Sequence, residues 1–252
     1  MQRFETFINY IMTAHIANSI NTFLRRFGYE VKATARLPKQ NLLGIKGRFK
    51  IQTVLDVGAN IGQFALEART HFPEATIHSF EPVRTTFDQL AKISQGNPLW
   101  HSYQLALSSE KCVRAMHVHV DHSSSSSLLE STPTEAILFP STIVKRDVNC
   151  VTLDEWASDM SASLTSDVLL KMDVQGHEDS VLRGARETLR HVDVIITEVI
   201  IETLYTSQAR FSEIVSMLDD AQFDFVGVLE HGFSKQGNVI AFDAVFINRK
   251  QN

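Results

Sequence analysis

Residues 53–64 read TVLDVGANIGQF, and this stretch decides the fold. A short apolar run that contains Asp56 ends at Gly58, and an amphipathic segment begins after Gly62. This pattern predicts a buried strand, a tight turn and the start of a helix. Glycine lacks a Cβ and asparagine accepts a positive φ, so Gly58, Asn60 and Gly62 let the backbone approach a ligand closely. The turn therefore predicts a small ligand pocket at the end of the strand.

Two kinds of nucleotide ligand compete for this turn. A dinucleotide site has the spacing G-x-G-x-x-G, which rests a pyrophosphate on the helix N-terminus. The chain lacks that spacing. Its own spacing, D-x-G-x-N-x-G, resembles motif I of class I S-adenosylmethionine-dependent methyltransferases, in which the loop surrounds an amino-acid moiety and a ribose. An ordinary strand-to-helix turn also fits, so the residues downstream have to decide.

The next two predicted strands complete the expected cofactor site. Residues 76–80 form the second strand and end in Glu81-Pro82. A carboxylate at the end of a second strand can accept both ribose hydroxyls, so we expect Glu81 to bind the ribose. A third strand is expected over residues 100–107, with Ala106 near the base. The expected cofactor-binding residues are Asp56, Gly58, Asn60, Gly62, Glu81 and Ala106.

The composition excludes several classes of function. The chain has 252 residues, 44% of them apolar and 21% charged, which is ordinary for one α/β domain with a modest extension. The net charge is −5 without a lysine or arginine run, so nucleic acid is not an expected partner. Cys112 and Cys150 match neither a disulfide framework nor a zinc site, and we interpret both as buried thiols of a cytoplasmic protein. No stretch reaches the roughly 20 apolar residues of a transmembrane helix.

Residues 4–27 carry apolar side chains at helical spacing. We expect a helical extension over residues 1–49, followed by the cofactor-binding domain over residues 50–252. The extension is expected to pack on that domain or to cover the substrate. The alternatives are that it lies on a membrane surface or pairs with another subunit in a homo-oligomer. Three arginines are its only basic residues before residue 28, which disfavours lipid binding.

The rest of the chain alternates predicted helices and strands, which indicates a doubly wound parallel sheet. The last two strands are joined without a helix, so an antiparallel edge strand is expected. Ligands of such sheets bind beyond the carboxyl ends of the strands. The serine run over residues 123–127 has the composition of a flexible loop, either a linker or a substrate-facing lid. Further strands are expected at 148–153, 167–173, 193–198, 223–229 and 241–248, and helices at 84–95, 178–191 and 208–221.

Three segments resemble the FkbM-type methyltransferases. They are VLDVGANIGQF (54–64) with FEP (80–82), SSSSSLL (123–129) with VTLDEW (151–156), and LLKMDVQGHEDSVLRGA (169–185). The resemblance covers roughly residues 50 to 248 and implies the class I methyltransferase fold. It also implies S-adenosyl-L-methionine as the methyl donor. The acceptors of that family are mostly hydroxyl groups on sugars, glycans or macrolide rings, so a small-molecule or glycan acceptor is expected.

A hydroxyl acceptor must lose its proton during methyl transfer, which requires a general base. We expect His177 as this base, with Asp173 or Glu178 orienting it or contacting the acceptor. The competing interpretations are that His177 only packs at the helix start and that Glu178 only offsets the helix dipole. Lys171 lies inside a predicted strand, and we expect it to pair with an acid, Glu198 being the first candidate.

Three alternatives to this interpretation are considered at the level of sequence. Asp173, His177 and Glu198 present metal-ligand types, but their spacing matches no recognised motif, so no metal is expected. The same cofactor also serves carbon and nitrogen methyltransferases, in which His177 would matter less. A non-catalytic cofactor-binding protein that acts through its N-terminal helix is the third interpretation. The missing G-x-G-x-x-G disfavours a nicotinamide dehydrogenase.

Overall fold

A computed structural model describes residues 42–159, 164, 167–234 and 236–251. Residues 41–252 form one compact unit. The helix expected over residues 4–27 lies outside the described residues, so the division of the chain at residue 49 stays a prediction. None of the helices within the described ranges is long and apolar enough to cross a membrane.

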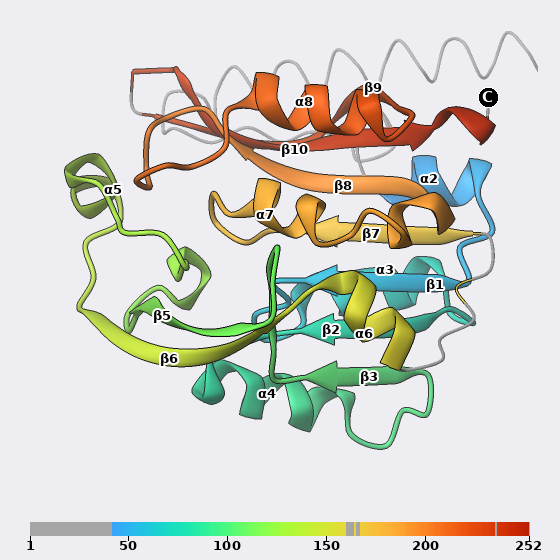
Figure 1. Cartoon of the computed structure of the whole chain (residues 1–252), viewed down its shortest axis with the longest axis horizontal. Coiled ribbons are helices and arrows are strands. Elements are labelled where there is room, and N and C mark those ends of the chain that lie inside the picture. Colours follow the sequence, from blue (N-terminus) through green and yellow to red (C-terminus); the bar gives the residue numbers. More distant parts are fainter. Residues whose placement is uncertain (1–41, 160–163, 165–166, 235, 252) are drawn as a thin grey trace, which may run out of the picture. The chain divides into compact units, whose positions relative to one another are not determined.

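The unit is built on a seven-stranded sheet with the order β3-β2-β1-β7-β8-β10-β9 (Figure 1). Neighbours from β3 to β8 pair in parallel, whereas β10 pairs antiparallel with both β8 and β9. The predicted mostly parallel sheet with an antiparallel edge is therefore confirmed. The strands are β1 (Thr53–Val57), β2 (Thr76–Phe80), β3 (Trp100–Tyr103), β7 (Val168–Met172), β8 (Val192–Ile200), β9 (Phe223–Phe233) and β10 (Val239–Asn248).

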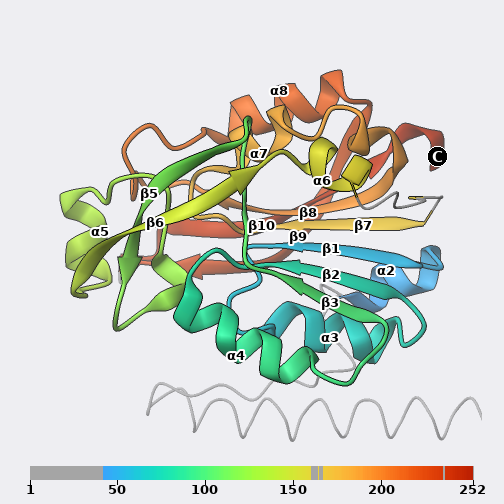
Figure 2. The same ribbon diagram turned by 60° about the horizontal axis from the view of Figure 1, so that its bottom comes forward.

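Helices cover both faces of this sheet (Figure 2). One face packs against α2 (Leu42–Arg48), α3 (Gln63–His71) and α4 (Arg84–Ser94). The other packs against α6 (Leu153–Asp159), α7 (Glu178–Arg183) and α8 (Phe211–Asp220). Successive strand residues point to opposite faces, so a strand buried on both sides reads as a continuous apolar run.

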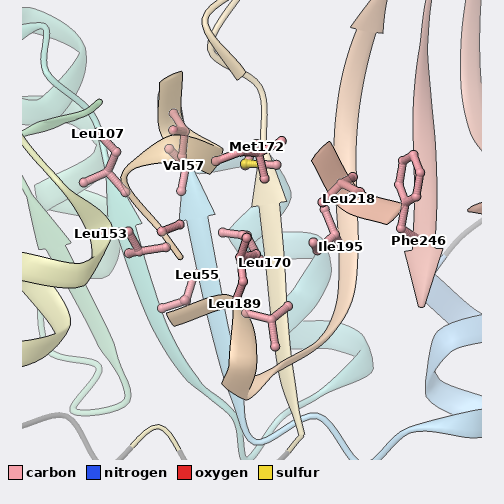
Figure 3. Packing of buried hydrophobic residues seen from close by; sticks show 14 of the residues in the cluster. Leu55, Val57, Leu107, Leu153, Leu170, Met172, Leu189, Ile195, Leu218 and Phe246 are labelled. Carbon is pink, nitrogen blue, oxygen red and sulfur yellow. The ribbon is translucent and has the colours of Figure 1, made fainter. Parts of the chain in front are cut away.

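The central strands show this two-sided burial directly. Leu55 and Leu170 point to the α6–α8 face and pack with Leu153 and Leu189 (Figure 3). Val54 points to the α3 face and is also fully buried. Burying one such side chain contributes about 1.5–3 kcal/mol, so these runs hold the strand ends rigidly in place.

Toward the carboxyl ends of the strands, the α3 face changes from apolar to charged. Asp56 and Lys171 are paired neighbours in β1 and β7, and Glu198 and Asp243 are paired neighbours in β8 and β10. Each lies two residues from an apolar residue of the core on the same face. The sheet therefore presents a row of ionisable side chains where ligands bind in such folds.

A small second sheet lies beyond these strand ends (Figure 1). Its order is β4-β6-β5, and it comprises β4 (Ala106–Leu107), β5 (Cys112–His119) and β6 (Ile143–Val151). The short helix α5 (Pro133–Leu138) follows β5 in the chain. Cys150 is buried, as expected, whereas Cys112 is only partly buried, and both thiols are free.

Two predicted elements differ from the structure. The strand expected over 100–107 divides, because Tyr103 is the last partner of β2, which ends at Phe80. Residues 106–107 join the small sheet instead. The helix expected over 178–191 ends at Arg183, and a 3-10 helix follows at Thr188–His191. Between these two helices, a Cβ on Gly184 would lie 2.1 Å from the carbonyl oxygen of Ser108. The backbone at Gly184 therefore packs directly against the backbone that follows β4.

Candidate active site

The glycine loop after β1 has the backbone that its sequence predicts. Gly58, Asn60 and Gly62 all have positive φ, at 76°, 49° and 96°. A Cβ on Gly58 would lie 1.9 Å from the backbone oxygen of Asp173. A Cβ on Gly62 would lie 3.1 Å from the Trp100 ring. The loop therefore approaches the segment after β7 more closely than any side chain at position 58 would allow.

Asp56 precedes the loop and is completely buried. Its Oδ2 accepts a hydrogen bond from the Ser79 hydroxyl at 3.2 Å. Its Oδ1 has no hydrogen-bond partner among the described residues. Burial raises the pKa of Asp56 to about 6, although the Lys171 ammonium opposes the shift. A buried carboxylate oxygen without a partner is costly, so Asp56 is suited to receive a donor from a ligand.

Glu81 is also buried and lies against the same loop. Its Oε1 accepts from the Val83 N–H at 2.7 Å, and its Oε2 accepts from the Asn60 N–H at 3.1 Å. Burial raises the pKa of Glu81 to about 7, and the two N–H donors oppose that shift. These bonds orient the carboxylate and leave each oxygen a second lone pair for a hydroxyl donor.

Ala106 lies beside this turn. It is buried in β4, pairs with Cys150 and shares an apolar cluster with Val83, the residue that donates to Glu81. The structure therefore brings Ala106 and Glu81 to the same corner of the fold. Asp56, Gly58, Asn60 and Gly62 line its other side.

The second half of the site is a pair of acids bridged by an amide. The Gln175 Nε2 donates to Asp173 Oδ1 at 2.8 Å and to Glu198 Oε2 at 2.6 Å. Lys171 Nζ donates to Asp173 Oδ2 at 2.8 Å. The prediction that Lys171 pairs with an acid is therefore confirmed, but the first candidate, Glu198, is wrong. The partner of Lys171 is Asp173, which directly follows β7.

The two acids differ in their electrostatics. Burial raises the pKa of Glu198 well above its ordinary range, and the charges of Asp173 and Glu178 add to this shift. Burial acts in the same direction on Asp173, but the Lys171 ammonium and the side-chain hydrogen bonds to Asp173 together lower the pKa of that carboxyl. Asp243 has its pKa raised to about 6, mainly by burial. The site therefore holds more carboxyl groups than its single lysine can balance.

Gln175 is a site residue that was not singled out from the sequence. Its φ is 55°, in the left-handed region that non-glycine residues rarely adopt. Its Oε1 lies 2.8 Å from the Tyr205 hydroxyl, and its backbone oxygen accepts from the Ser127 hydroxyl at 2.7 Å. Its position in the segment LLKMDVQGHEDSVLRGA was the only available signal, because the partners lie far away in the chain.

The serine run contacts both the glycine loop and the segment after β7, so its interpretation as a plain linker is wrong. Residues 123–125 form a 3-10 helix, and Ser125, Ser126 and Ser127 are buried. The Ser123 hydroxyl donates to Asn60 Oδ1 at 3.2 Å, in the glycine loop. The Ser127 hydroxyl bonds the segment after β7. Composition suggested flexibility, but these hydroxyl groups are used as hydrogen-bonding groups between the two halves of the site.

His177 and Glu178 are held by partners other than Asp173. His177 is 3% exposed, and its Nε2 lies 3.1 Å from the Ser108 hydroxyl. Burial, with the nearby Arg114 charge, lowers the pKa of His177 to about 4. Glu178 Oε1 accepts from the N–H groups of Val174 and Gly176, and burial raises its pKa to about 7.

The three candidate catalytic residues therefore separate into two environments. Asp173 belongs to the bridged acid pair. Glu178 instead accepts a hydrogen bond from the Val174 N–H in the loop before α7, and His177 lies against the Ser108 hydroxyl. No hydrogen bond between described residues joins His177 to Asp173. Across the described ranges there is no group of three or more His, Cys, Asp or Glu side chains arranged to hold a metal ion. An amide N–H2 group also stands between the two acids, which is a donor and not a metal ligand.

Residues 56–225 match the family described as the methyltransferase FkbM domain. The 31-O-demethyl-FK506 methyltransferase FkbM of Streptomyces tacrolimicus is 30% identical over 158 residues, which are 53% of this chain and 59% of that protein. The 2-O-methyltransferase NoeI of Sinorhizobium fredii is 36% identical over 88 residues, which are 35% of this chain and 34% of that protein. The chain thus spans less than two thirds of either relative's length.

Among solved structures, the methyltransferase FkbM from Methylobacillus flagellatus KT aligns with a TM-score of 0.47 and 13% identity. That alignment covers 77% of this chain and 44% of the other, and at this TM-score it carries no argument. The family match covers more than half of the chain and includes the glycine loop, the serine run and the acid pair. The chain therefore belongs to the FkbM methyltransferase domain family and has the class I methyltransferase fold.

Proposed function

We propose that this protein transfers a methyl group from S-adenosyl-L-methionine to a hydroxyl group of a sugar, a glycan or another small hydroxylated acceptor. One observation carries the proposal: the glycine loop touches the acid-bearing segment, with Gly58 against the Asp173 carbonyl. A cofactor held by the loop would therefore have the bridged acids as its neighbours. The names of the two curated relatives, both O-methyltransferases, support the choice of oxygen as the acceptor atom.

The donor set at the loop fits this cofactor. Asp56 offers an oxygen that lacks a partner, and Glu81 offers a buried, oriented carboxylate for the two ribose hydroxyls. Gly58, Asn60 and Gly62 leave the backbone open to close approach. Ala106 presents a small apolar surface near the Glu81 turn, where we place the base. When bound, the cofactor supplies a methyl group already activated on a sulfonium.

The acid pair provides the proton chemistry. With the cofactor bound, the methyl group would pass to the acceptor oxygen as S-adenosylhomocysteine leaves, and a carboxylate oxygen of Asp173 or Glu198 would take the hydroxyl proton. A base with a raised pKa holds that proton better, which favours Glu198, while Asp173 stays ionised beside Lys171.

The structure favours a positioning part for His177 over the role of base expected from sequence. A pKa of about 4 makes its imidazole a weak proton acceptor at neutral pH. Its bond to Ser108 ties the start of α7 to the end of β4. Glu178 in turn fixes the loop that carries Gln175. Both remain candidates to be tested beside Asp173.

The full chain, incubated with S-adenosyl-L-methionine and a panel of hydroxylated acceptors, tests this proposal. Formation of S-adenosylhomocysteine that depends on an acceptor, with a matching methyl ether by mass spectrometry, is the expected result. Cofactor binding without transfer to any acceptor would instead favour a non-catalytic protein. In this proposal residues 50–252 form the catalytic domain, and residues 1–49 form an extension that covers the acceptor or pairs two subunits.

A further inference from the structure

Several partners at the site hold both the backbone and the side chain of Gln175. Its backbone is in the left-handed region, its carbonyl accepts from Ser127, and its side-chain amide bonds three further groups. A non-glycine residue is strained in this conformation and persists in it where the surroundings over-determine it. Such a position indicates a task that the fold alone does not require.

The orientation of the Gln175 amide follows from its partners. Two carboxylate oxygens, from Asp173 and Glu198, lie on the Nε2 side, and carboxylates only accept when ionised. The Tyr205 hydroxyl lies on the Oε1 side and can donate to it. Turning the amide over would place its oxygen against two carboxylates, so the acids select the orientation in which Oε1 faces the Tyr205 hydroxyl.

Tyr205 is itself fixed. It is 1% exposed, and its hydroxyl also lies 2.9 Å from the Ser125 carbonyl oxygen in the serine run. The space beside it is full, since a Cβ on Gly176 would lie 3.4 Å from the tyrosine ring. The serine run, Tyr205 and Gln175 therefore form one connected frame around the acid pair.

The charged groups around Glu198 explain why its carboxylate needs a hydrogen-bond donor held in place. Lys171 acts on it from β7, Asp173 from the segment after β7, Glu178 from α7 and Asp243 from β10. Three carboxyl groups and one ammonium surround it, and like charges this close favour protonation. Among the residues that the structure describes, the Gln175 amide alone donates to both Glu198 and Asp173.

We propose that Gln175 is a positioning residue that holds the Asp173 and Glu198 carboxylates as one proton-accepting pair, and that the Tyr205 hydroxyl holds the Oε1 of its amide in place. The catalytic meaning of this pair rests on the proposed function. The hydrogen-bonding frame itself does not, and it can be tested without any acceptor.

The test is a pH titration by NMR of the full chain labelled with 13C at the glutamate carboxyl carbons, with Glu198 assigned through Glu198→Gln. Removing the donor with Gln175→Ala is expected to raise the apparent pKa of Glu198 by about one pH unit, because the amide favours its ionised form. Ala keeps a Cβ at the same backbone conformation, so the strain is matched.

Tyr205→Phe removes only the hydroxyl and is expected to shift the same pKa upward by a smaller amount. If Gln175→Ala does not fold, the Glu198 pKa measured in Tyr205→Phe decides the test. Tyr103→Phe is the matched control, since that hydroxyl bonds His78 and not the frame, and it is expected to leave the titration unchanged. An unchanged or lowered Glu198 pKa in both Gln175→Ala and Tyr205→Phe would overturn the proposal. Failure of methyl transfer with an intact pKa shift would overturn only the proposed function.

Discussion

The backbone oxygen of Asp173 occupies the space that a side chain at position 58 would need, since a Cβ on Gly58 would lie 1.9 Å from it. Gly58 directly follows β1 and Asp173 directly follows β7, and these two strands are neighbours in the sheet. The Asp173 N–H also donates to the Val57 carbonyl at 3.0 Å. This contact holds the glycine loop and the acid pair in one rigid arrangement. The account of the site depends on it.

Gly58→Ala is the first prediction. The new Cβ meets the Asp173 carbonyl, and alanine is strained at a φ of 76°, so the free energy of unfolding should fall by about 2–6 kcal/mol. Chemical denaturation measures this change. Gly47→Ala is the control, because Gly47 lies exposed in α2 with nothing within 4 Å of its Cβ position, and alanine there should stabilise the helix slightly. Equal stability of the two variants would contradict the contact.

The second prediction concerns Glu81 and the ribose. Glu81→Ala removes an acceptor for two hydroxyl groups, so the affinity for S-adenosyl-L-methionine should fall about tenfold to a hundredfold by calorimetry. Glu74→Ala, at an exposed turn before β2, should bind as the unmodified chain does. Unchanged affinity in a folded Glu81→Ala variant would remove Glu81 from the cofactor site.

A third prediction follows from Glu178, whose pKa rises from 4.5 to about 7 through burial. The folded state binds this proton more tightly than the unfolded state, so its contribution to stability is present below pH 4.5 and is lost as pH rises through 7. Glu178→Gln removes this titration but keeps an oxygen for the Val174 N–H. Between pH 4 and pH 8, the free energy of unfolding of the unmodified chain should fall by about 3 kcal/mol relative to that of Glu178→Gln. If the unfolding free energies of the unmodified chain and Glu178→Gln differed by the same amount at every pH, the raised pKa of Glu178 would be contradicted.

The fourth prediction separates the acid pair from His177 as the source of the base. Asp173→Asn should lower turnover by about a hundredfold or more, because it disrupts the bridged pair, while cofactor affinity changes little. His177→Gln keeps a hydrogen-bonding group toward Ser108 and should lower turnover by less than about tenfold. Single-turnover kinetics with saturating cofactor make the comparison. A larger loss in His177→Gln than in Asp173→Asn would restore His177 as the base.

Much of this arrangement could be predicted from local sequence. The strand, turn and helix around Gly58 follow from residues within one short segment, and Glu81 follows from the end of the next strand. Such features depend on backbone geometry and strand order, which local patterns encode.

The partners of the acid pair could not be predicted in the same way. Gln175 meets Tyr205 and Ser127 only after three separate loops have folded together. The serine run shows the same limit, because its composition favours a flexible loop until burial turns its hydroxyl groups into hydrogen-bond partners. Glu198 was only the first candidate for Lys171, because the sequence does not show that Asp173, just past the end of β7, reaches back to the lysine.

The most direct test of the central claim follows the methyl group itself. The full chain is incubated with S-adenosyl-L-methionine carrying a 13C-labelled methyl group and with a hydroxylated acceptor from the panel, and the product is examined by NMR. The account predicts a labelled methyl ether, formed in equal amount with S-adenosylhomocysteine and lost in Asp173→Asn. Label on carbon or nitrogen, or no transfer by a chain that binds the cofactor, would contradict it.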